Sequence, residues 1–250
     1  MKLSLTTLLL SALVAASLST AANAGQDAIR KAIEQSFPGT RINSIAASPI
    51  NGLHEVVTDG PEGLLIVYAD DKGEHLLVGD LINMQTRRNL TRDRTDKLTL
   101  VSWSSLPLDN AIKSVKGDGS RQFAVFSDPD CPYCRKAEAE FAKLDNVTIY
   151  TFAYPLPMHP DAERKAKLVW CSEDRAKAWH DLMLKGVVPK GRTDCDNPLE
   201  ANLALGEKIR IQGTPAMVFP NGKRVPGYVE AGRLELMLNE IADARIGAGN

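Results

Sequence analysis

The spacing of hydrophobic residues changes along the chain and predicts an N-terminal region of helix and sheet. Apolar residues recur at helical spacing between 26 and 37, and Pro38-Gly39 is expected to end that helix. Short alternating runs then predict strands at 41–46, 54–58, 64–69 and 75–78, with a hairpin turn at 70–73. Residues 25–83 are therefore predicted to form one helix and a small antiparallel sheet. A unit of about 60 residues buries little core alone, so we expect it to associate with a second copy.

A polar segment separates this region from the rest of the chain. Residues 84–89 are polar and turn-like, and residues 91–101 read as a charged helix with little apolar face. That composition is typical of a connector exposed on most sides. Pro107 ends the segment, and a short helix is expected at 108–115. We therefore predict a linker over residues 84–107.

The remainder of the chain, 108–250, has an α/β pattern. Strands are predicted at 122–127, 147–152, 216–219 and 223–225. Helices are predicted at 132–144, 162–171, 174–185, 198–209 and 230–244. Asn221-Gly222 is a strong hairpin signal between the last two strands. This order is that of a thioredoxin fold with a helical insertion, so the predicted class is α+β / α/β with a thioredoxin-like catalytic domain.

Composition excludes several broad classes. The 250 residues are 44% hydrophobic and 24% charged, which is typical of a globular chain and excludes collagen-like or wholly disordered proteins. Lys and Arg number 30, and Asp and Glu number 31, so the formal net charge is −1. A strong basic field is therefore absent, and we expect no nucleic-acid partner.

The first 24 residues have the features of an export signal. Lys2 is followed by an apolar stretch at 8–18 and by Ala22-Asn23-Ala24, which matches a cleavage site. A membrane anchor is the alternative, but the apolar run is shorter than the ~20 residues that a span requires. We therefore predict a cleavable signal peptide and an oxidising compartment, the periplasm, where disulfides persist.

The chemistry of the sequence is concentrated at Cys131 and Cys134. They form a C-x-x-C between a predicted strand and a predicted helix, with Pro132 suited to the first turn of that helix. A cysteine at a helix N-terminus is stabilised as a thiolate, and such placement lowers a thiol pKa from about 8.5 to ~3.5–7.5. Cys134 is one turn further on and within reach to close a disulfide. We predict a catalytic redox dithiol.

Three other interpretations of this pair compete with redox chemistry. A structural disulfide of such short separation is unusual, and a copper site would need a nearby Met or His cluster. A zinc site would need a second close cysteine pair, whereas Cys171 and Cys195 are far apart in the sequence. No metal site and no cofactor are therefore expected.

Gly213-Thr214-Pro215 immediately precedes a predicted strand. In thioredoxin-fold proteins a cis-proline at this place faces the dithiol; an ordinary trans turn proline is the alternative. Thr214 would then present backbone groups to an extended substrate peptide. We predict that Thr214 and Pro215 bind substrate together with Pro132 and Tyr133.

The second cysteine pair and the histidines have structural interpretations. Cys171 and Cys195 flank the predicted helix 174–185, and we predict a structural disulfide worth roughly 3–4 kcal/mol; a second redox pair is the alternative. The four histidines are scattered without metal-ligand spacing, so surface or structural roles are expected for His54, His75, His159 and His180.

Taken together, these motifs resemble the DsbC/DsbG family of bacterial periplasmic disulfide isomerases, and the second cysteine pair places the chain closer to DsbC. The similar segments are Phe126 to Cys134, Val169-Trp170-Cys171-Ser172, Cys195, Gly213-Thr214-Pro215-Ala216, Asn221-Gly222 and Pro226-Gly227-Tyr228. The resemblance implies a small cystatin-like N-terminal dimerisation domain, a linker helix and a C-terminal thioredoxin fold. It also implies a V-shaped homodimer whose cleft holds misfolded disulfide-containing proteins, and a membrane-bound DsbD-type reductase that keeps the dithiol reduced.

The hypothesis is therefore a disulfide isomerase with chaperone activity. Cys131 would attack non-native disulfides, and Cys134 would resolve stalled mixed disulfides. Three alternatives stay open: a dithiol oxidase, a DsbG-like reductase of oxidised cysteines, and a non-enzymatic holdase.

Overall fold

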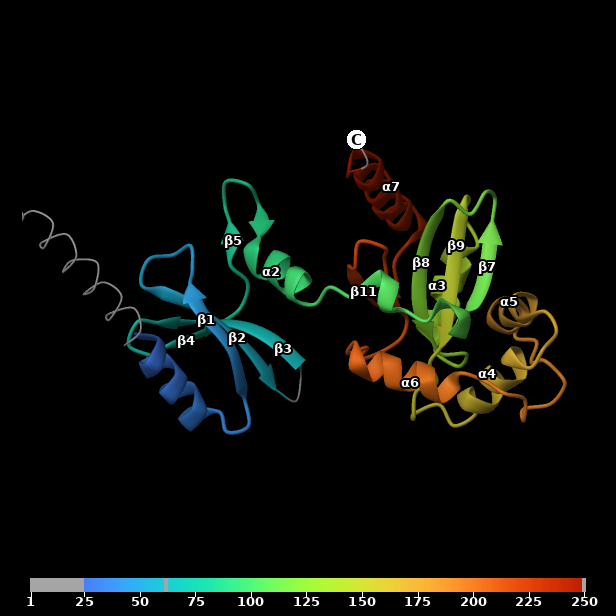
Figure 1. Ribbon diagram of the computed structural model, residues 1–250, viewed down its shortest axis with the longest axis horizontal. Coiled ribbons are helices and arrows are strands. Elements are labelled where there is room, and N and C mark those ends of the chain that lie inside the picture. Colours follow the sequence, from blue (N-terminus) through green and yellow to red (C-terminus); the bar gives the residue numbers. More distant parts are fainter. Residues whose placement is uncertain (1–24, 61–62, 249–250) are drawn as a thin grey trace, which may run out of the picture. The chain divides into compact units, whose positions relative to one another are not determined.

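The computed structural model describes residues 25–60 and 63–248, which form two compact units (Figure 1). The first unit ends at Leu98 and the second begins at Thr99. The predicted signal peptide lies outside the described residues, and the predicted linker bounds, 84–107, stay a prediction. No helix among the described residues is both long enough and apolar enough to cross a membrane.

The first unit is a helix packed on an antiparallel sheet, as expected. The helix covers residues 25–36, and the strands lie in chain order: β1 (Arg41–Ala47), β2 (Leu53–Gly60), β3 (Gly63–Asp70) and β4 (Leu76–Val78). Ile29 and Ile33, one helical turn apart, are buried against the sheet. Their partners on alternate strand positions are Val56, Val67 and Ala69.

The segment after β4 packs on this unit more closely than an exposed connector would. It forms a short hairpin, β5 (Ile82–Asn83) and β6 (Arg88–Asn89), and then helix α2 (Leu90–Leu98). The buried Thr91 hydroxyl lies 2.5 Å from the Tyr68 hydroxyl of β3 and accepts from the Leu81 N–H. The low apolar content of α2 concealed this anchoring, because the contact is polar.

The second unit is built on a five-stranded sheet in the order β11-β10-β8-β9-β7. The central strands β8 and β9 are parallel, and the other pairs are antiparallel. The strands are β7 (Ile112–Lys116), β8 (Arg121–Ser127), β9 (Val147–Ala153), β10 (Ala216–Val218) and β11 (Arg224–Pro226).

Helices cover both faces of this sheet. They are α3 (Pro132–Phe141), α4 (Ala162–Trp170), α5 (Arg175–Lys185), α6 (Leu199–Lys208) and α7 (Ala231–Ala248). Phe123 and Val125 of β8 point to a core shared with α3 and α7, while Ala124 and Phe126 point to the opposite core. The predicted thioredoxin order with a helical insertion, α4 to α6, is thus present.

The predicted short helix at 108–115 is wrong. A single 3-10 turn at Leu108–Asn110 is followed by edge strand β7, which pairs with β9. In β7 only Ile112 is buried, and Val115 is exposed. The strand therefore lacks a continuous apolar pattern, and its conformation depends on pairing with β9, which is distant in sequence.

Candidate active site

Helix α3 begins at the C-x-x-C, and its local sequence explains why. Cys131 is the N-cap residue, with an extended backbone (φ −71°, ψ 122°), and Pro132 fills the first helical position, where its missing N–H costs nothing. The Cys131 carbonyl accepts from the Arg135 N–H at 3.2 Å, which closes the first turn. Cys131 therefore lies at the positive end of the α3 dipole, where an anion is stabilised.

Both cysteines of this pair are free thiols, and both are buried. Cys131 is 5% exposed and Cys134 is 1% exposed. Burial raises the pKa of the Cys134 thiol to about 12, although the Asp128 N–H, 3.4 Å from its sulfur, opposes that shift. Cys134 is therefore protonated at neutral pH. The two thiols thus occupy electrostatically different positions within one helical turn.

A buried carboxylate, Asp128, holds the loop that carries Cys131. Its Oδ1 accepts from the N–H groups of Asp130 at 2.7 Å and Cys131 at 3.1 Å. Its Oδ2 accepts from the Leu156 N–H at 2.6 Å and pairs with His159 Nδ1 at 2.9 Å. Four hydrogen bonds compensate the burial of this carboxylate and join the active-site loop to the loop after β9.

The predicted Gly213-Thr214-Pro215 segment lies directly against this loop. The Thr214–Pro215 peptide bond is cis, and the Cys131 thiol lies 3.4 Å from the Thr214 carbonyl, which accepts from it. Pro215 is buried, and its carbonyl accepts from the Gly227 N–H at 2.7 Å. The fold thus brings together residues separated by 83 positions, because β10 pairs with β8.

Pro132 and Tyr133, the remaining predicted substrate-binding residues, are exposed at the start of α3. Tyr133 is 60% exposed, and the Lys136 ammonium lies 5.3 Å from the centre of its ring. An exposed aromatic ring at the start of α3 can contact an incoming polypeptide without first being uncovered. Its position is compatible with the predicted role.

Cys171 and Cys195 form a disulfide with a Cα–Cα distance of 5.8 Å. The bridge brackets α5, whose buried Trp179 packs in the same core as Cys134. Trp179 Nε1 donates to the Glu138 carboxylate of α3 at 3.3 Å, and burial raises the pKa of Glu138 to about 7. Helix α5, which the disulfide brackets, therefore packs against the buried side of α3.

Asp128 and His159 were not identified from the sequence as parts of one site. Asp128 precedes Cys131 by three positions, which is the spacing of a side chain that caps a turn, and this was the available signal. His159 had no spacing signal, because it meets Asp128 across 31 positions. It has a structural partner, as expected, but that partner belongs to the active-site loop.

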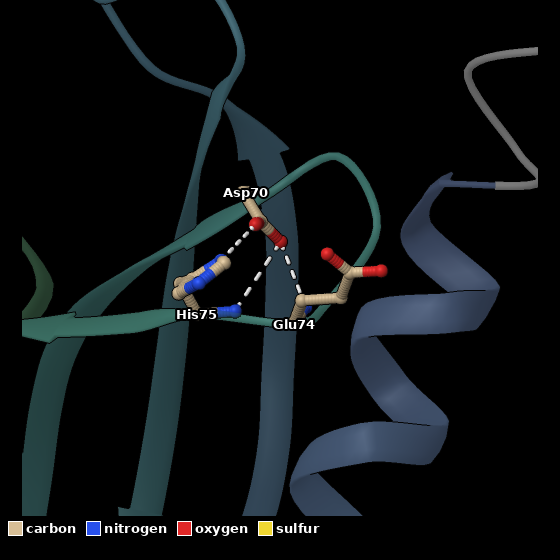
Figure 2. Close-up of side chains that lie close together, drawn as sticks. All are labelled: Asp70, Glu74 and His75. Atoms are coloured by element: carbon tan, nitrogen blue, oxygen red, sulfur yellow. Dashed lines mark hydrogen bonds and ion pairs between the residues drawn. The ribbon is translucent and has the colours of Figure 1, made fainter.

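A cluster of possible metal ligands lies in the first unit, at the turn between β3 and β4 (Figure 2). Asp70 accepts from the N–H groups of Glu74 and His75, and from His75 Nδ1 at 2.7 Å. The His75 hydrogen bond lowers the pKa of Asp70 to about 2. These bonds explain the cluster as a side-chain cap of the hairpin turn, so we assign no ion to it.

Comparison with known proteins agrees with this geometry. A family model described as a thioredoxin-like domain matches residues 108–242, and one described as a disulfide bond isomerase protein N-terminal domain matches residues 20–92. The chain is 42% identical over 212 residues to a probable thiol:disulfide interchange protein DsbC of Bordetella parapertussis, covering 85% of this chain and 74% of that protein. The chain belongs to the DsbC family.

Two further relatives support this DsbC assignment. The DsbC of Escherichia coli, a thiol:disulfide interchange protein, is 28% identical over 215 residues, covering 84% of this chain and 87% of that protein. A crystal structure of a disulfide interchange protein from Neisseria gonorrhoeae is 49% identical and matches with a TM-score of 0.53. It covers 54% of this chain and 97% of that one. The predicted family, fold class and thiol:disulfide oxidoreductase chemistry are confirmed.

Proposed function

We propose that this DsbC-family protein is a periplasmic protein disulfide isomerase whose nucleophile is Cys131. The observation that carries the proposal is the contrast between the two thiols. Cys131 lies at the α3 N-terminus against the Thr214 carbonyl, while burial keeps the pKa of Cys134 at about 12. The Cys131 sulfur is thus placed to attack a disulfide, and the Cys134 sulfur stays protonated until a mixed disulfide has formed.

Isomerisation needs no net oxidation or reduction. The Cys131 thiolate attacks one sulfur of a non-native disulfide, and the other substrate sulfur leaves as a thiolate. A different substrate thiolate then attacks the mixed disulfide, forms a new substrate disulfide and releases Cys131 as a thiolate. The substrate ends with the same number of disulfides, differently paired.

Cys134 resolves mixed disulfides between Cys131 and a substrate when no substrate thiolate does so. Its sulfur attacks the Cys131 sulfur of the mixed disulfide, loses its proton, and expels the substrate as a thiol. The substrate bond is then reduced, and Cys131 and Cys134 are oxidised to a disulfide. Returning them to the dithiol takes two electrons, which we assign to a membrane-bound DsbD-type reductase.

Substrate is held, on this proposal, beside the cis peptide and the exposed start of α3. Thr214 offers its backbone to an extended chain beside the cis-proline Pro215, while Pro132 and Tyr133 offer apolar surface. The recognition is independent of sequence, because backbone and general apolar contacts carry it. That property suits an enzyme whose clients are misfolded proteins of many kinds.

The first unit supports the proposal of a homodimer. Its edge strand β4 pairs with β3 on one side, and within the described sheet no strand follows it on the other. Leu76, Leu77 and Val78 are all exposed there. An exposed apolar edge strand is a template for pairing, and a second copy of the same strand is its simplest partner.

The test of the proposed function is refolding of a scrambled protein with several disulfides. Cys131→Ser should abolish recovery of native disulfides, whereas the wild-type protein restores them. Unchanged recovery with Cys131→Ser would contradict the proposal. Trapping the cysteines in cells then separates the alternatives: mostly reduced Cys131 and Cys134 support an isomerase or reductase, and mostly oxidised ones support an oxidase.

Chaperone activity is measured apart from redox chemistry. The Cys131→Ser/Cys134→Ser double variant should still suppress aggregation of a cysteine-free client if the dimer holds misfolded chains. Loss of suppression would remove the chaperone part of the proposal and leave the isomerase part intact. Sedimentation of the mature protein as a monomer would likewise contradict the proposed dimer.

A further inference from the structure

The residue directly before the proposed nucleophile is an acid, Asp130. Its side chain is only 19% exposed, and its Oδ1 lies 2.5 Å from the Lys165 ammonium of α4. Lys165 is also largely covered, with 16% of its side chain exposed. A pair this close and this well covered is screened less by solvent than an exposed surface pair.

Other charged groups lie close to the Asp130–Lys165 pair. Arg135 of α3 approaches Asp130 at 3.8 Å, and Asp161, just before α4, approaches Lys165 at 3.3 Å. Arg164 is occupied by a bidentate contact with Asp161. From the neighbouring loops, Asp128 binds the Asp130 and Cys131 N–H groups, and His159 binds Asp128.

An unpaired carboxylate beside Cys131 would oppose formation of the thiolate. Asp130 directly precedes Cys131 in the chain, and like charges near one another disfavour ionisation, more so in a partly buried site than in water. Lys165 supplies the opposite charge at the shortest distance to Asp130. The Asp130 carboxylate raises the pKa of the Lys165 ammonium, so Lys165 stays charged throughout the pH range in which thiols titrate.

We propose that Lys165 is a positioning residue for the reaction: by neutralising Asp130 it maintains the thiolate fraction of Cys131, and with it the rate of attack on disulfides. This inference rests on the proposed function, in which Cys131 is the nucleophile. It assigns to α4, the first helix of the insertion, an electrostatic role in addition to packing. It also explains how an acid is tolerated next to a cysteine that reacts as an anion.

The test is the pH dependence of Cys131 alkylation by iodoacetamide in the reduced full-length protein, followed by mass spectrometry. Lys165→Met should raise the midpoint by about half to one pH unit, so alkylation below the midpoint slows about three- to tenfold. Asp130→Asn should move the midpoint in the opposite direction, because Lys165 and Arg135 then act on Cys131 unopposed. The Lys165→Met/Asp130→Asn double variant should return close to wild type.

Matched variants separate charge from structure. Lys167→Met removes a lysine of the same helix that pairs with Glu163 at 2.6 Å, and it should leave the midpoint unchanged. Lys165→Arg should preserve the wild-type midpoint. High salt should shrink the Lys165→Met shift, as expected for a charge effect that solvent still reaches.

Several outcomes would overturn the inference. An unchanged midpoint in Lys165→Met, or shifts of the same sign in Lys165→Met and Asp130→Asn, would show that the pair acts only through structure. If Lys165→Met does not fold, Asp130→Asn alone decides, since an unchanged or higher midpoint contradicts the proposal. Failure of the proposed function is distinguishable, because Cys131→Ser would then remain active in refolding whatever the titration of the lysine variants shows.

Discussion

The second unit contains two cysteine pairs that differ in almost every physical respect. Cys131 and Cys134 lie within one helical turn, are free and are nearly inaccessible. Cys171 and Cys195 are separated by 24 positions, are joined and are half-buried on either side of α5. The surrounding backbone, rather than the chemistry of the thiol group, therefore distinguishes the proposed redox pair from the disulfide-bonded pair.

This difference indicates that the two cysteine pairs have different roles. In the first pair, Cys131 is the N-cap of α3, where the helix dipole stabilises a negative charge on its sulfur, whereas Cys134 is buried one turn further on. The second pair closes a loop of chain whose helix packs behind the first. On the proposed function, the redox chemistry belongs to Cys131 and Cys134, and Cys171 and Cys195 have a structural role.

The largest expected effect is on resolution by Cys134. Cys134→Ser should accumulate mixed disulfides between Cys131 and client proteins, because the sulfur that expels the client is missing. Non-reducing electrophoresis after acid trapping measures the complexes. The double variant Cys131→Ser/Cys134→Ser is the control and should form none. Equal amounts of complex in the single variant and in wild type would remove Cys134 from the proposed pathway.

Deleting the second pair should damage stability and spare chemistry. Cys171→Ala/Cys195→Ala is expected to lower the free energy of unfolding by about 3–4 kcal/mol, in the chain-entropy account of a loop of this size. Urea unfolding monitored by tryptophan fluorescence measures the loss. At a temperature where the variant is folded, Cys131 should still form mixed disulfides at a near wild-type rate. Loss of that reaction in the folded variant would mean the second pair participates in exchange.

Resolution should also depend steeply on pH. Because burial raises the pKa of Cys134 to about 12, its thiolate fraction rises about tenfold for each pH unit in the physiological range. The rate at which a preformed mixed disulfide decays should therefore increase about tenfold per unit between pH 6 and pH 8. Quenched-flow sampling with a peptide client measures it. A rate independent of pH would show that another group accepts the proton before attack.

The smallest expected effect is on stability, at Glu138. This residue of α3 accepts a hydrogen bond from Trp179 of α5, the helix that the second cysteine pair brackets. Burial raises the pKa of Glu138 from an ordinary 4.5 to about 7, because the charged carboxylate is disfavoured in the folded protein. The free energy of unfolding is therefore unaffected by this group below about pH 4.5 and decreases as the pH rises to about 7. Glu138→Gln keeps an acceptor for Trp179 and removes that loss. We expect the variant to exceed wild type by about 1–2 kcal/mol at pH 8, since the residue is only partly buried, and to match it at pH 4.5. Parallel pH dependence in both proteins would contradict this.

Much of the fold and the central pair of the site could be predicted from the sequence, because their signals are local. Pro132 inside the C-x-x-C marks a helix start, and Asn221-Gly222 marks a hairpin, so α3, β10 and β11 follow from short windows. Gly213-Thr214-Pro215 is the exception, because its position near the dithiol follows from the expected thioredoxin order and not from the residues beside it. For α3, β10 and β11, a few adjacent residues determine the backbone.

The unpredicted features depend on contacts between distant segments. Strand β7 is defined by pairing with β9, since its own pattern has one buried residue. Asp128 meets His159 across 31 positions, and Asp130 meets Lys165 across 35. Periodicity and motif spacing contain no information on such polar pairs, because a charged residue on a helix is ordinarily solvated.

The near-complete burial of the Cys131 residue has a consequence for which client proteins can react with it. Cys131 is 5% exposed and its thiol lies 3.4 Å from the Thr214 carbonyl, so we expect a disulfide on a loose, extended stretch of chain to reach it more readily than one inside compact structure. A correctly folded client keeps its disulfides inside compact structure and offers no such stretch. The enzyme would then not need to distinguish native from non-native disulfides directly. A client would no longer react once folding had buried its disulfides.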